Sequence, residues 1–149
     1  MKKLNKKGFT LVELLAVIVI LALLIVVVAN TALPAMNNAK KNSLEVYAER
    51  VVNQAKALHA SAQVDINSVK KADGATNACT QNSGVYTCTF ANISEVMGAD
   101  TDSTYTIVSG SPVVVTYSGG KYTVTGKISG SGFTTTITTN SGKITYTTA

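Results

Sequence analysis

The stretch from Phe9 to Ala29 constrains this chain more than any other part of its sequence, because it is polar only at Thr10 and Glu13. An α-helix of this length extends about 30 Å, which matches the hydrocarbon thickness of a bilayer. The stretch therefore predicts a helix that crosses a membrane once.

Charge on either side of this stretch predicts its orientation. Four lysines precede it, at Lys2, Lys3, Lys6 and Lys7. Only Lys40 and Lys41 follow soon after, so we expect the N-terminus in the cytoplasm and the rest outside. A cleaved signal peptide is the weaker alternative, because the run exceeds an ordinary signal core and Ala29-Asn30-Thr31 is a poor cleavage site.

The early lysines also account for most of the formal net charge of +5. From Phe9 onward, basic and acidic residues nearly balance. A dedicated nucleic-acid surface is therefore not expected.

A helical pattern continues beyond the apolar run. Apolar residues recur at steps of three and four at Leu44, Tyr47, Val51, Ala55, Leu58 and Ala62. This stripe is typical of an amphipathic helix, and one long helix over residues 9–62 is the simplest interpretation. Pro34 interrupts it, so we expect a bend or local unwinding there.

The C-terminal part is rich in Thr, Ser, Gly and Tyr, with a period of two. We expect a head over residues 63–149, made of a connecting region (63–103) and an antiparallel meander of four or five strands (104–149). Strands meet at Gly119-Gly120 and again near Asn140-Ser141-Gly142. The predicted fold class is α+β, a long helix packed on an antiparallel sheet.

Cys79 and Cys88 both lie in the connecting region, with Asn82-Ser83-Gly84 able to reverse the chain between them. A disulfide is expected on the outer side of a membrane. Two free thiols are the alternative. A metal site is not expected, because two cysteines cannot complete a shell and His59 lies on the distant helix.

No catalytic constellation or cofactor motif is evident, so neither an enzyme nor a cofactor is predicted. His59 is the single histidine and is interpreted as a partly exposed helix residue. Asp100 and Asp102 leave cation binding open, although a solvated turn is the better interpretation. Asn92-Ile93-Ser94 matches a glycosylation sequon.

Glu13 needs an explanation, because carboxylates are costly in hydrocarbon. One interpretation is a capping box with Thr10 at the helix start. The other is a cut after Gly8, which leaves a new ammonium on Phe9 one helical turn from Glu13. In a bundle of such helices, Glu13 would pair with the ammonium of a neighbour.

The segment from Lys6 to Leu14, KKGFTLVEL, resembles the leader and cleavage motif of type IV prepilins, shared with type II secretion and competence pseudopilins. The resemblance implies a leader, residues 1–8, removed by prepilin peptidase after Gly8. Phe9 would be the N-methylated new terminus and Glu13 the assembly carboxylate. The similarity covers about residues 1 to 35, and the mid-chain cysteines differ from the C-terminal disulfide of many pilins.

By that resemblance, the chain is expected to be a type IV pilus subunit that forms a helical homopolymer for adhesion, motility or aggregation. Its partners would be prepilin peptidase, the pilus assembly machinery and, before assembly, membrane lipid. The precursor would sit in the cytoplasmic membrane and the filament outside the cell. A pseudopilin of a secretion or DNA-uptake machine is the alternative, followed by a membrane-anchored enzyme or binding module.

Overall fold

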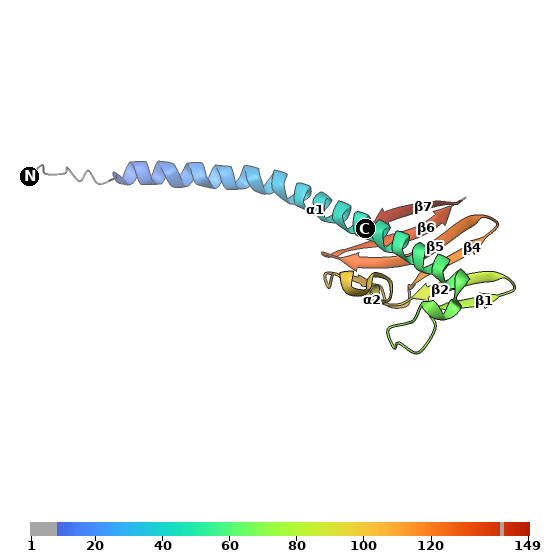
Figure 1. Ribbon diagram of the computed structural model, residues 1–149. Coiled ribbons are helices and arrows are strands. Elements are labelled where there is room, and N and C mark those ends of the chain that lie inside the picture. The colour runs from blue at the N-terminus through green and yellow to red at the C-terminus, as the bar shows by residue number, and fades with distance from the viewer. Residues whose placement is uncertain (1–8, 141) are drawn as a thin grey trace, which may run out of the picture. The chain divides into compact units, whose positions relative to one another are not determined.

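The computed structural model describes residues 9–140 and 142–149 and divides the chain into two compact units, Met1–Asn38 and Ala39–Ala149. The predicted leader and Gly8 lie outside the described residues. The fold class is the predicted one, a long N-terminal helix and an antiparallel sheet (Figure 1).

Helix α1 extends from Leu11 to Val64, two residues later at each end than the sequence predicted. Pro34 lies inside it and is itself helical, as are the residues on both sides. A bend at Pro34 stays a prediction. In the first unit, the large apolar side chains from Phe9 to Val28 are at least half exposed.

Short elements follow the helix. They are η1 (Ile66–Ser68), β1 (Cys79–Asn82), β2 (Val85–Phe90), α2 (Ile93–Met97) and η2 (Gly98–Asp100). The expectation that the sheet begins at residue 104 is therefore wrong, because β1 and β2 form a hairpin inside the connecting region. β1 (CTQN) is short and mostly polar, whereas β2 (VYTCTF) carries an alternating strand pattern that the sequence analysis did not use.

The remaining strands match the predicted meander. They are β3 (Tyr105–Ile107), β4 (Val113–Ser118), β5 (Lys121–Gly130), β6 (Phe133–Asn140) and β7 (Lys143–Thr148). The described residues form one seven-stranded sheet in the order β1-β2-β4-β5-β6-β7, with β3 pairing with β5, and all pairs are antiparallel.

Strand β5 joins the two halves of the sheet. Its first half pairs with β4, whereas its second half pairs with β3 and β6. The change occurs at Gly126, where a Cβ would lie 2.8 Å from the carbonyl oxygen of Pro112. Near Gly126, the Thr139 hydroxyl accepts from the N–H of Val124 at 2.8 Å and donates to its carbonyl oxygen at 2.9 Å. These side-chain bonds join β6 to β5 where the two strands have no backbone pairing.

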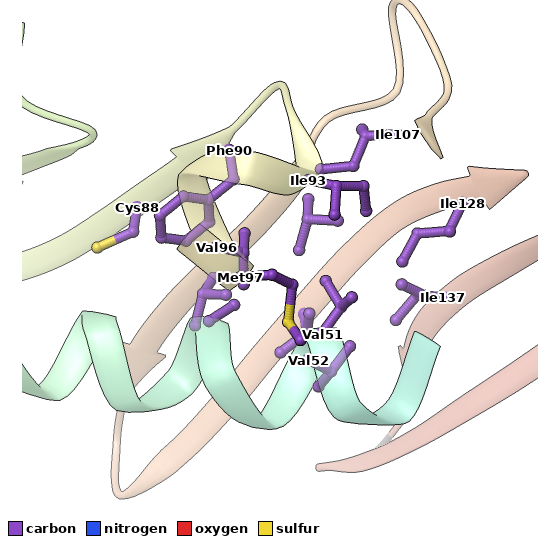
Figure 2. Close-up of a cluster of buried hydrophobic side chains, with 14 of the residues drawn as sticks. Val51, Val52, Cys88, Phe90, Ile93, Val96, Met97, Ile107, Ile128 and Ile137 are labelled. Atoms are coloured by element: carbon purple, nitrogen blue, oxygen red, sulfur yellow. The ribbon is translucent and has the colours of Figure 1, made fainter. Parts of the chain in front are cut away.

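The hydrophobic core lies between the sheet and the part of α1 within the second unit. Figure 2 shows Val51 and Val52 of the helix near Met97 of α2 and Ile137 of β6. All buried residues among those described fall between Leu44 and Ile137, so the second unit contains the whole core. Burial of these apolar side chains is the main source of its stability.

One buried polar residue, Thr135 of β6, is satisfied by a chain of hydroxyls. Thr148 donates to Glu45 Oε1 at 2.6 Å, and Thr135 lies 2.7 Å from the Thr148 hydroxyl. Because Thr148 donates to Glu45, Thr135 donates to Thr148. The chain of bonds joins β6 and β7 to α1.

Candidate functional site

The first turn of α1 holds the carboxylate that the sequence analysis singled out. The backbone N–H and the hydroxyl of Thr10 donate to Oε2 of Glu13, at 2.8 and 2.9 Å. The N–H of Glu13 donates back to the Thr10 hydroxyl at 3.3 Å. This is a capping box, which satisfies N–H groups that a helix start leaves unpaired.

The two oxygens of Glu13 differ in their contacts. Both hydrogen bonds from Thr10 end on Oε2, and Oε1 has no partner among the residues that the structure describes. The cap therefore leaves one carboxylate oxygen available for another cation. The capping interpretation and the pairing interpretation of Glu13 are compatible.

The surroundings of this carboxylate are apolar. Phe9 is 87% exposed, and the helix that follows is long and apolar enough to cross a membrane. The site thus consists of one carboxylate at the end of an uncovered apolar helix. It holds no second titratable side chain from the described residues that would serve acid–base catalysis.

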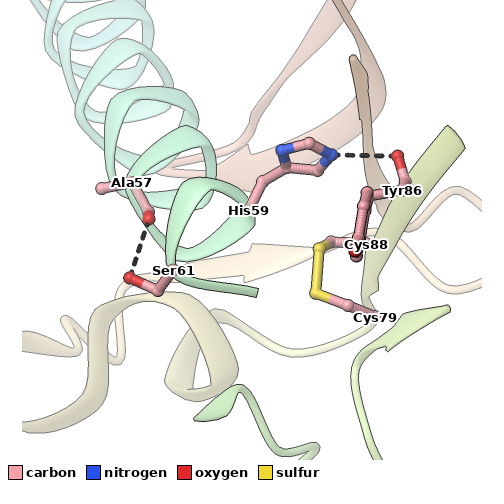
Figure 3. Close-up of a disulfide and its surroundings, with 6 residues drawn as sticks. All are labelled: Ala57, His59, Ser61, Cys79, Tyr86 and Cys88. Atoms are coloured by element: carbon pink, nitrogen blue, oxygen red, sulfur yellow. Dashed lines mark hydrogen bonds between the residues drawn. A yellow bond between two sulfur atoms is a disulfide. The ribbon is translucent and has the colours of Figure 1, made fainter. Parts of the chain in front are cut away.

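The disulfide between Cys79 and Cys88 is present, and it lies in the second unit (Figure 3). The two residues are direct cross-strand partners of β1 and β2. Both side chains are buried, so the bond ties the edge strand β1 into the core. It belongs to the second unit, whereas Glu13 belongs to the first.

His59 is fully buried, and the expectation of partial exposure is wrong. Its ring contacts Tyr122 edge-on at 5.5 Å between centroids, and Tyr86 and Tyr117 lie near it. The tyrosines of three strands enclose the imidazole. No nucleophile or carboxylate forms a hydrogen bond to it among the described residues, so a catalytic role has no support.

Sequence analysis missed the role of Glu95, which joins three segments. It accepts hydrogen bonds from the N–H groups of Ala72 (3.1 Å) and Ala91 (2.7 Å) and from the backbone and side chain of Asn92. Burial raises its pKa, but these hydrogen bonds outweigh burial and hold the pKa below its ordinary value. The spacing Asn92-x-x-Glu95 is a capping signal that would have identified it.

The aspartates left open for cation binding have other partners. Asp100 pairs with Arg50 at 3.4 Å, with both side chains well exposed. Asp102 accepts from the N–H of Thr104 at 2.8 Å, and this hydrogen bond lowers the Asp102 pKa. Within residues 9–140 and 142–149, no three His, Cys, Asp or Glu side chains are placed to hold a metal ion.

Comparison with known proteins identifies the N-terminal segment. Residues 3–29 match the model of the prokaryotic N-terminal methylation motif. No curated protein and no solved structure matches the chain. The matched segment contains Phe9, the capped Glu13 and the whole apolar run to Ala29.

This motif implies processing by a prepilin peptidase and pilus-type assembly, and proteins that carry it in this architecture are structural. The motif stands at the start of a helix that extends to Val64 and precedes an antiparallel sheet. By these features, the chain has the N-terminal motif of type IV pilins and pseudopilins, followed by a long helix and an antiparallel sheet.

Proposed function

We propose that the chain is the structural subunit of a type IV pilus filament on the cell surface. The observation that carries this proposal is the apolar helix that no other described residue covers, with Glu13 Oε1 at its end unbonded within the described part of the chain. A surface of this size is covered by lipid or by other protein. Membrane lipid covers it in the precursor, and the helices of neighbouring subunits cover it in the filament.

Glu13 sets the stagger between neighbouring helices. Cleavage after Gly8 removes four lysines and creates an ammonium on Phe9, which is then methylated. In the bundle, Oε1 of one subunit accepts from the Phe9 ammonium of the next. Two charges desolvated as a pair are much less costly than either one buried alone, so other staggers are disfavoured.

Replacement of Glu13 tests this proposal. Glu13→Val leaves the neighbour's ammonium buried and unpaired, at a cost of about 3–5 kcal/mol per subunit. We expect Glu13→Val and Glu13→Gln to be cleaved and to remain in the membrane, yet to give few or no filaments. Electron microscopy of sheared surface material measures the filaments, and mass spectrometry of the membrane fraction measures cleavage.

Thr10→Val is the matched control, because it removes the capping hydroxyl and keeps the carboxylate. Loss of a cap costs only about 1 kcal/mol, so this variant should form filaments close to the wild-type amount. Abundant normal filaments from Glu13→Val would show that the carboxylate acts only as a cap, and would overturn the pairing. Absence of surface filaments built from the wild-type chain would favour a pseudopilin.

A further inference from the structure

The sheet has one face against α1 and one face that we call the outer face. The outer face consists of the strand positions that alternate with core residues. On β5 these are Lys121, Thr123, Thr125 and Lys127, and the positions paired with them on neighbouring strands continue the face. None of these four side chains is buried. Val124, which lies between Thr123 and Thr125, and Ile128, which follows Lys127, are buried on the opposite face.

Threonine dominates the outer face and is aligned from strand to strand. The register pairs Thr80 with Thr87, Thr87 with Thr116, and Thr116 with Thr123, which gives one row across four strands. On the other half of the sheet, Thr136 pairs with Thr147 and Thr138 with Thr145. The Thr138 and Thr145 hydroxyls bond each other. The other hydroxyls of these rows can donate and accept hydrogen bonds, beside methyl groups that give apolar contact.

The charge on this face has a single sign. None of the described strands contains Asp or Glu, and the sequence has no acidic residue after Asp102. Lys121, Lys127 and Lys143 are exposed, and none forms an ion pair with a described residue. The lysines thus lie among neutral hydroxyls without a countercharge from their own sheet.

Two of these lysines lie near one another, and the third borders a hollow. The stem of Lys121 lies against Gly142, where a Cβ would be only 3.0 Å from Lys121 Cδ, so Lys121 and Lys143 share one end of the sheet. Lys127 borders a shallow hollow on the outer face, lined also by Val114, Thr125 and Thr136. Gly126 forms part of this hollow.

We propose that the outer face binds an acidic polysaccharide, a sugar polymer that carries carboxylate groups. The carboxylates pair with the three lysines, and the sugar hydroxyls exchange hydrogen bonds with the threonine rows. An exposed sheet face suits an extended polymer, because neighbouring rows repeat at the strand spacing. Single exposed ion pairs are weak, so affinity depends on several contacts made together.

A nucleic acid is also a polyanion, but this face lacks the groups that stack on bases. The strand tyrosines near His59 and Tyr105 near Tyr47 lie on the helix side of the sheet. Phe133 lies beneath Lys41 of α1. With no aromatic ring and no arginine on the outer face, single-strand binding by stacking has no platform.

The proposal is tested on the full chain, synthesised cell-free into a non-ionic detergent. In the reference protein and in every variant, Gln replaces Lys2, Lys3, Lys6 and Lys7, so that the leader adds no positive side chain of its own. Binding of polygalacturonate fragments is measured by calorimetry at low and at physiological salt, with a neutral galactan of equal length as the second probe. We expect binding of polygalacturonate that weakens with salt.

Two variants locate the site. Binding should weaken about tenfold in the triple variant Lys121→Gln/Lys127→Gln/Lys143→Gln. Binding should not change in the control variant Lys40→Gln/Lys56→Gln/Lys71→Gln, which removes the same charge away from this face. Thr116→Val/Thr123→Val/Thr136→Val keeps shape and strand preference and removes three hydroxyls. It should weaken binding about three- to tenfold.

Each other outcome overturns the proposal. These outcomes are no binding at low salt, equal binding of the neutral galactan, and equal effects of the two lysine variants. Tighter binding of an oligonucleotide than of polygalacturonate would assign the face to nucleic acid instead. Because the test uses unassembled chain, its failure leaves the filament proposal intact, and loss of filaments in Glu13 variants leaves this one intact.

Discussion

His59 Nε2 lies 2.9 Å from the carbonyl oxygen of Tyr86, and this contact joins α1 to β2. A carbonyl oxygen only accepts, so Nε2 carries the proton and donates. Nδ1 is buried with no hydrogen-bond partner among the described residues. The imidazole therefore acts as a structural element of the core, with one directional bond and three tyrosines around it.

His59→Ala should destabilise the second unit by about 2–4 kcal/mol, because it opens a cavity and leaves the Tyr86 carbonyl without this donor. His59→Gln, which keeps an N–H donor, should cost less. Urea unfolding of a fragment that begins at Ala39 gives both values. Gln63→Ala, at an exposed position on the same helix, is the control, and an effect of His59→Ala no larger than the control would contradict the structural role.

Reduction of the Cys79–Cys88 disulfide should lower the melting temperature of the same fragment. The bond closes a short ring, with a sequence separation of 9. The chain-entropy model gives a contribution of about 2–3 kcal/mol for such a ring, or roughly 10 °C for a small domain. Calorimetry with and without reductant measures the shift, and Cys79→Ala/Cys88→Ala should melt at the reduced temperature in both conditions. Two free thiols in a non-reducing peptide map would contradict the pairing.

Glu95 should make stability depend on acid pH. Its pKa in the folded state is held below the ordinary value of 4.5, so its contribution is complete above that value. The contribution is lost as pH falls from about 4.5 through the lower folded pKa. Glu95→Gln should cost about 1–2 kcal/mol at neutral pH and less as the pH falls through this window.

The measurement for Glu95 is a difference between two unfolding curves at each pH. Asp73 and Asp102 also have lowered pKa values, so the wild-type curve alone does not isolate Glu95. Glu49→Gln is the matched control, because Glu49 is exposed on α1. A cost for Glu95→Gln that stays constant from neutral pH to pH values below the window would show that ionisation of Glu95 does not matter.

Gly8→Val should block removal of the leader. A substrate strand that enters a membrane protease next to bulky Phe9 has room for little more than a hydrogen at this position. We expect an uncut precursor in the membrane, detected by gel shift and by an intact N-terminal mass. Asn5→Val places the same side chain elsewhere in the leader and should be processed. Normal processing of Gly8→Val would count against prepilin-type cleavage.

Local patterns predicted most of this fold. Gly119-Gly120 and Gly142 mark turns between alternating stretches, and β4 to β7 occur there because strand and turn signals are local. The β1–β2 hairpin was missed because β1 is short and mostly polar, although β2 alternates in the way that strands do. Its buried residues are Cys79, Cys88 and Phe90. The disulfide partly compensates for this small apolar contribution.

The errors within the candidate sites concern contacts made across the chain. Helix periodicity selected Leu58 for the core, yet His59 is the buried residue and Leu58 is partly exposed. The tyrosines that enclose His59 come from strands far away in the sequence, and no helical pattern reports them. For Glu95, the local capping spacing Asn92-x-x-Glu95 was available but not used, whereas its bond to Ala72, 23 residues earlier, has no local signal.

The cap at the start of α1 also affects the entropy of assembly. A long side chain that becomes fixed in an interface loses rotamer freedom worth about 0.5–1.5 kcal/mol. Thr10 already holds Oε2 of Glu13 with two hydrogen bonds, so the carboxylate is restrained in the single subunit. Part of the ordering cost is thereby met when the helix folds, before a neighbour arrives, and the incoming ammonium meets a preorganised acceptor.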